Sequence, residues 1–97
     1  MNPQKQFELI RGVFESFEAK EVLLCLIDGK IKFHNHKIFS EEERFGVKNA
    51  NSIQRIKELS EAREQVLKLL DDCESNGTKL SIHSQIFVEL LAESEVA

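Results

Sequence analysis

The feature that most constrains this chain is a long helical pattern near its middle. Between Asn51 and Ser75, apolar residues recur at steps of three or four, which is the spacing of an amphipathic helix. Asn51 and Gln54 predict a capping box at its start, and Asn76-Gly77 predicts its end. We therefore expect a helix over residues 52–75, along which the rest of the chain packs. Its apolar positions are Ile53, Ile56, Leu59, Ala62, Val66, Leu69 and Cys73.

This helix also provides the strongest candidate for an interaction surface. From Leu59 onward the apolar steps run 3, 4, 3, 4, as in a coiled coil, although they cover barely two heptads. Such a stripe can be packed inside its own domain. Neighbouring leucines widen the apolar arc, however, so that one side can meet the same chain and another side a second chain. We predict a homodimer through this face, formed by Ile56, Leu59, Ala62, Val66, Leu69 and Leu70.

Further helices are predicted towards both ends of the chain. Asn2-Pro3 is a typical helix start, and the steps of Phe7, Ile10, Phe14 and Phe17 predict a helix over residues 3–19. Past Gly77 two interpretations remain. We favour a C-terminal helix over residues 81–93, with Ile82, Ile86, Phe87 and Leu90 on one face. The alternative is a short third strand over residues 79–83, followed by a helix capped by Ser84.

Between the first and the long helix, the sequence predicts a β-hairpin over residues 22–38. A continuous apolar run, Val22 to Ile27, precedes Asp28-Gly29, and an alternating run follows it. Asp-Gly between two strand-like runs favours a two-residue type I′ turn, which needs positive φ at the glycine. A short helical turn over residues 41–45 should follow, begun by Ser40 and ended by Gly46. The fold class expected is α+β, in one small domain covering residues 1–97.

Composition and charge restrict the classes of partner and the compartment. The net charge is −4, which makes nucleic acid an unlikely partner, and no stretch approaches the roughly 18 apolar residues of a membrane span. The N-terminus shows no signal-peptide pattern. Cys25 and Cys73 lie outside any metal-binding or redox motif, as expected of free thiols in a reducing compartment. We therefore expect a cytoplasmic protein.

One segment, Lys30 to Lys37, carries residue types suited to ligand binding. In a strand, His34 and His36 would point to the same side and could share a metal ion, with Cys25, His83 or Glu41–Glu43 as further ligands. Neighbouring lysines oppose a cation, so we predict no metal binding. The alternative ligand is a small anion held by Lys30, Lys32 and Lys37. The same lysines would also serve to protect an edge strand from aggregation.

Enzyme signatures are absent from the sequence, including phosphate-binding glycine loops, nucleophile elbows and metalloprotease motifs. We therefore predict a non-catalytic protein-interaction or regulatory module that needs no cofactor, associates with itself and binds another protein. Two alternatives use residues 30–37 instead. One is a ligand or metal sensor, and the other is a nucleic-acid accessory protein.

Overall fold

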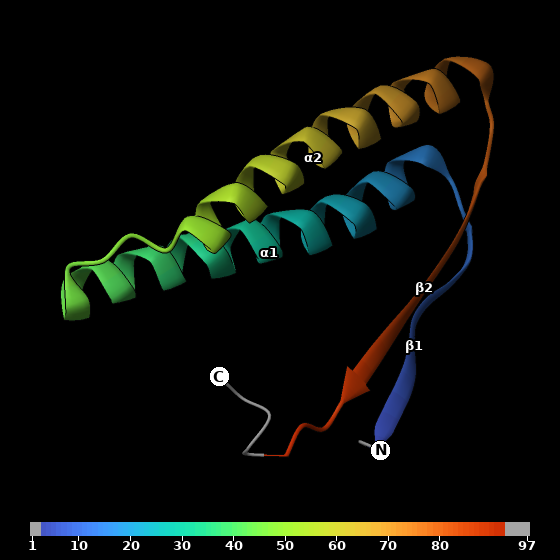
Figure 1. The fold of residues 1–97 in the computed structure, drawn as a ribbon. Coiled ribbons are helices and arrows are strands. Elements are labelled where there is room, and N and C mark those ends of the chain that lie inside the picture. The colour runs from blue at the N-terminus through green and yellow to red at the C-terminus, as the bar shows by residue number, and fades with distance from the viewer. Residues whose placement is uncertain (1–2, 93–97) are drawn as a thin grey trace.

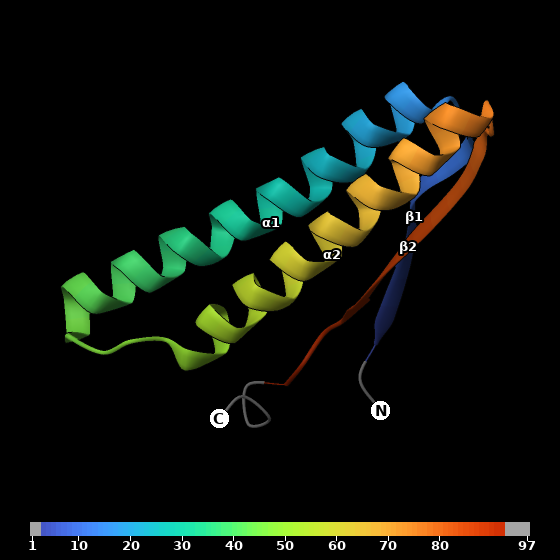
Figure 2. The same ribbon diagram turned by 90° about the horizontal axis from the view of Figure 1, so that it is seen from above.

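A computed structural model describes residues 3–92 of the chain. Four elements follow in the order β1 (Gln4–Phe14), α1 (Ser16–Phe45), α2 (Ala50–Asn76) and β2 (Leu80–Glu89). The two helices form an antiparallel hairpin, and β1 and β2 pair as an antiparallel two-stranded ribbon. Figures 1 and 2 show the helices side by side along their length, with the ribbon leaving from the end where α1 begins and α2 ends. The fold is a small α+β structure, as predicted, but with a different order of elements.

The predicted β-hairpin and the helical turn after it are both wrong, because residues 16–45 form one continuous helix. Gly29 lies in its middle, and its φ is not positive, so the Asp-Gly pair makes no turn. Partly buried residues recur along α1 at helical steps of 3, 4, 3 and 4. These are Leu24, Ile27, Ile31, His34 and Ile38. This spacing gives α1 a face that packs on α2, and the helix ends where predicted, at Gly46 with φ 65°.

The long helix is confirmed, and its end at Gly77 is placed as predicted, with φ 66° at that residue. Its start differs by two residues. The N-cap is Asn49 rather than Asn51, and the Asn49 side chain accepts a hydrogen bond of 2.9 Å from the Ser52 backbone N–H. The same side chain also donates a hydrogen bond of 2.7 Å from Asn49 Nδ2 to Glu41 Oε2. This bond connects the start of α2 to the last turns of α1.

Both predicted terminal helices are wrong, because their residues form the two strands of the ribbon. Phe7, Ile10 and Phe14 are paired with Ile86, Ser84 and Leu80, and the register shifts between Glu8 and Ile10, which leaves Leu9 as a bulge. The alternative of a short strand at residues 79–83 is right in part, since β2 begins at Leu80, but the helix expected from Ser84 is wrong because the strand continues to Glu89. Asn2, the predicted cap of the first helix, and Glu93, the last residue of the predicted C-terminal helix, lie outside the described residues.

The ribbon diverges from the helices, so the molecule has the shape of a V (Figure 1). We call the space between the ribbon and the helical hairpin the wedge. The Cα atoms extend over 50 × 35 × 14 Å, with a radius of gyration of 17.2 Å. A compact domain of this length would have a radius of gyration of about 12.5 Å. Among the described residues, the fully buried apolar side chains are only Ala19, Leu59 and Leu70. The hydrophobic core is therefore confined to the helical hairpin and the closed end of the wedge.

Candidate functional site

The predicted interaction face of the long helix lies mostly against α1. Leu59 and Leu70 are buried, while Ile56, Ala62 and Val66 are partly buried. Leu69 is the exception, with half of its surface exposed (50%). Burying an apolar side chain stabilises a fold by roughly 1.5–3 kcal/mol, and here that stabilisation is used within the chain itself. The face therefore holds the helical hairpin together and leaves little apolar surface for a second molecule.

The two histidines of residues 30–37 point to different sides of α1. Residues i and i+2 share a face in a strand but are separated by about 200° on a helix, so the helical fold moves them apart. His34 Nδ1 lies 3.0 Å from Ser52 Oγ on α2, whereas His36 borders a shallow groove elsewhere on α1. Within residues 3–92, no three His, Cys, Asp or Glu side chains are grouped to hold a metal ion.

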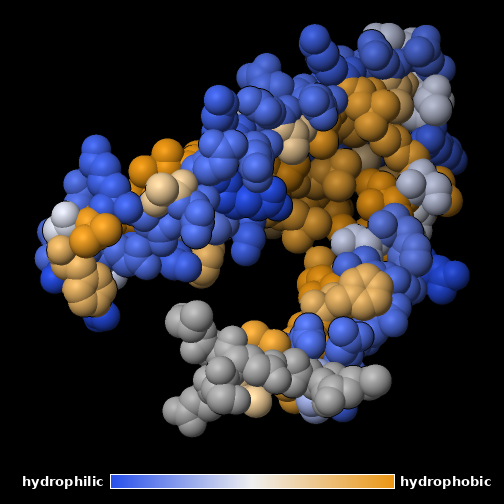
Figure 3. All heavy atoms as spheres, viewed as in Figure 1, coloured by the Kyte–Doolittle hydropathy of each residue, from blue (hydrophilic) through white to orange (hydrophobic). Residues whose placement is uncertain are grey.

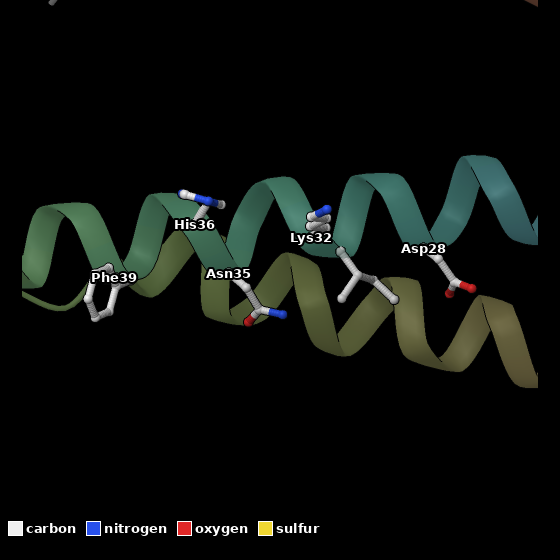
Figure 4. Close-up of a pocket in the computed structure, with 6 residues that line it drawn as sticks. Asp28, Lys32, Asn35, His36 and Phe39 are labelled. Atoms are coloured by element: carbon white, nitrogen blue, oxygen red, sulfur yellow. The ribbon is translucent and has the colours of Figure 1, made fainter.

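The groove beside His36 has a volume of about 530 Å³ and is lined by α1 residues only. In Figure 4, Asn35 points toward α2, while His36 points away from it. Lys32 and Asp28 also line this groove. Asp28 forms a 2.8 Å salt bridge to Arg63 of α2. This groove is wide and open, and its mixed lining defines no obvious ligand.

Two of the predicted anion-binding lysines do meet, on the other side of α1. Lys30 and Lys37 line a groove of about 360 Å³ together with Arg55 of α2, a residue that the sequence prediction missed. We call this set, Lys30, Lys37 and Arg55, the cationic groove. The Lys30 ammonium lies 4.8 Å from the centre of the Phe33 ring, and Arg55 forms a 3.0 Å salt bridge to Glu58. The remaining lining residues are polar: His34, Asn49, Asn51 and Ser52.

The positive charge of this groove affects the pKa of His34. Partial burial lowers the pKa of the His34 imidazole below its ordinary value of 6.5, and Lys30, Lys37 and Arg55 lower it further. Its Nε2 atom is buried without a hydrogen-bond partner. The neutral imidazole is therefore favoured, with Nδ1 hydrogen-bonded to the buried Ser52 hydroxyl. This arrangement suits a structural contact between the helices and not a metal ligand.

The largest feature that sequence analysis missed is the inner face of the ribbon. Strand alternation and the pairing register place seven apolar side chains on one side, which we call the apolar ribbon face. These are Phe7, Ile10, Phe14, Leu80, Ile82, Ile86 and Val88. Figure 3 shows apolar atoms gathered in the notch between the helices and the ribbon. Near the closed end the face is partly buried, whereas Phe7 and Ile86 farther along are 56% and 41% exposed.

Comparisons of this chain with protein-family models, with characterised proteins and with solved structures give no match. Neither described helix contains a stretch long and apolar enough to cross a membrane.

Proposed function

We propose that this protein is a non-catalytic protein-interaction module that works as a homodimer and, through the dimer, binds another protein. The observation that supports self-association is the excess of exposed surface. The chain exposes 7845 Å². A folded monomer of 11.2 kDa would expose about 5,700 Å², so roughly 2,000 Å² is in excess.

The size of this excess matches what an obligate dimer buries. Obligate homodimers bury about 2,000–5,000 Å² in total, or about 1,000–2,500 Å² per copy. The small core points the same way, since three buried apolar residues would contribute only a few kcal/mol towards holding the fold. A chain whose stability depends on a partner must find that partner as soon as it is synthesised. A second copy of the same chain is always present at that point.

We propose that the module is cytoplasmic. Both cysteines are free in the described structure, Cys25 exposed and Cys73 partly buried, which supports a compartment where thiols stay reduced.

Analytical ultracentrifugation over a range from nanomolar to micromolar protein tests the proposal. We expect the sedimentation-average mass to rise from that of one chain to that of two as the concentration increases. A mass of one chain at every concentration, with helical circular dichroism retained, would exclude the homodimer.

The cationic groove favours a second candidate function, binding of a phosphate-like anion. Its three cations come from two helices, and within residues 3–92 only Arg55 among them forms a salt bridge, to Glu58. Titration with inorganic phosphate or pyrophosphate, followed by amide NMR shifts, tests this function. Lys37→Gln should weaken the response several-fold, and Lys32→Gln, in the opposite groove, should leave it unchanged. Equal effects of the two substitutions would reject a site here.

A further inference from the structure

The open part of the wedge identifies where the proposed dimer forms. Building on the proposed function, we propose that a second copy of this chain docks on the exposed end of the apolar ribbon face, around Phe7, Ile86 and Val88. The long helix, which the sequence suggested as the dimer surface, is then an internal support and not the interface.

The two faces of the ribbon differ in chemistry, and the inner face is the more continuously apolar of the two. The outer face carries Glu8 with two partners: Arg11 at 3.6 Å and His83 at 3.4 Å. Its other positions include Gln6, Ser81 and Gln85, which water can hydrogen-bond, and two exposed apolar side chains, Val13 and Phe87. The apolar ribbon face has no comparable polar groups beyond Lys5 and Ser84. A face of this composition, about ten residues long, is typical of a surface buried in an interface.

The inner face is covered by the helices only in part. Ile10, Phe14, Leu80 and Ile82, closer to the helices, are partly buried, and Phe7, Ile86 and Val88 beyond the bulge are exposed. The loss of burial along the ribbon follows the opening of the wedge in Figure 1. A two-stranded ribbon is marginal in water without packing on one face. The far half of this ribbon therefore requires an outside partner in order to persist.

The area and the symmetry both favour a second copy as that partner. The roughly 2,000 Å² of excess surface belongs to the whole chain, the exposed ribbon face is one part of it, and its size is within what each copy of an obligate homodimer buries. A two-fold dimer uses the same patch on both chains, so one self-complementary apolar face suffices. Joined in this way, two V-shaped chains would bury both exposed ribbon faces and give each wedge the second layer that domains normally have.

Adjacent residues of β2 provide a matched pair of variants. Ile86 lies on the apolar ribbon face and is 41% exposed, whereas Phe87 lies on the outer face and is 67% exposed. In ultracentrifugation, Ile86→Glu should raise the dimer dissociation constant at least a hundredfold. Phe87→Glu should change it less than threefold, although it removes the larger and more exposed side chain. If the two variants dimerise equally well, the interface lies elsewhere, even though the homodimer itself stands.

Because Ile86→Glu could lose dimerisation simply by misfolding, a second measurement uses the chain without that substitution. The chain is labelled with 4-fluorophenylalanine, and the resonances of Phe7 and Phe87 are assigned by single Phe→Leu substitutions. On dilution through the dissociation constant, the Phe7 resonance should shift and that of Phe87 should stay in place. A shift at Phe87 alone would overturn the proposed surface. Absence of any dimer at all concentrations would instead overturn the proposed function on which this inference rests.

Discussion

His34 occupies a position on α1 that an apolar residue would normally fill, between Ile31 and Ile38 on the side that packs against α2. It is held there by the Ser52 hydroxyl, 3.0 Å away, which is itself positioned by the N-cap of α2. A polar pair inside a helical hairpin contributes little net stability, but it disfavours registers in which either group would be left unpaired. His34 and Ser52 thus fix how the two helices align.

Lowering the pH should destabilise the fold through His34. Its pKa in the folded protein is lowered by partial burial and by Lys30, Lys37 and Arg55, so the unfolded chain binds the proton more readily. Well above pH 6.5 the imidazole is neutral in both states, and stability is lost as the pH falls through that value, where the unfolded chain begins to bind the proton. Thermal melts between pH 7.5 and 5 should show a drop that His34→Gln reduces. His36→Gln is the control, and a profile that His34→Gln leaves unaltered would contradict the role assigned to His34.

The cap of α2 can be tested with two neighbouring asparagines. Asn49→Ala removes the bond to the Ser52 N–H and the contact with Glu41, and should cost about 1 kcal/mol of unfolding free energy. Asn51→Ala, inside the first turn and exposed, should be neutral or slightly stabilising. Urea denaturation of the two variants measures the difference. A larger loss of unfolding free energy for Asn51→Ala would show that Asn51, as predicted from the sequence, is the N-cap.

At the scale of whole elements, α1 combines features that favour a strand with features that favour a helix. Its apolar run and its Asp-Gly pair are typical of a hairpin, yet the helix runs through both. A glycine inside a helix costs about 1 kcal/mol relative to alanine, and nothing lies within 4 Å of a Cβ placed on Gly29. The packing of α1 on α2 outweighs this local cost.

Gly29→Ala should therefore stabilise the protein by about 1 kcal/mol, which corresponds to several degrees in Tm for a chain of this size. The hairpin prediction implies the opposite sign, because a type I′ turn would require positive φ at this glycine. Gly46→Ala serves as the comparison. It places a side chain at φ 65° and should lower Tm by a similar amount. A lower Tm for Gly29→Ala would be incompatible with a continuous α1.

The long helix could be predicted because its apolar spacing, its length and its end at Gly77 agree with one another. The ribbon could not, and the bulge at Leu9 explains much of this failure. The bulge places Phe7 and Ile10, which are three residues apart, on the same face of the strand. The next step, of four residues to Phe14, is compatible with a strand as well as with a helix. A bulged strand thus imitates helical spacing. In α1 the polar His34 interrupts an otherwise apolar stripe, which hid its helical period.

The same misassignment affected the candidate site. Lys30 and Lys37 are seven positions apart, two turns of a helix, and the structure places them in one groove where a strand would have separated them. Arg55 could not be identified from sequence, because its proximity depends on how α1 and α2 align. The apolar ribbon face was hidden for a related reason, since its members come from opposite ends of the chain.

At the scale of the whole molecule, the V shape leads to a prediction about how stability depends on protein concentration. If two copies cover each other's ribbons, folding and association are linked, and Tm rises with protein concentration. Calorimetry at 5 µM and at 500 µM should show an increase of several degrees for the unsubstituted chain. Ile86→Glu should melt at one temperature throughout. A concentration-independent Tm for both proteins would argue that the chain is stable as a monomer.

The strand pairing also has a consequence for the order of folding. Every pair in the ribbon joins residues more than sixty positions apart, from Phe14 with Leu80 to Gln4 with Glu89, whereas α1 and α2 are neighbours joined by a short loop. Closing the larger loop costs more chain entropy, so the helical hairpin should form first and the ribbon last. Changes on the ribbon should then alter the rate of unfolding and leave the rate of folding nearly constant. If the ribbon is the self-association surface, a nascent chain would complete that surface only in the final step, after the second strand has left the ribosome.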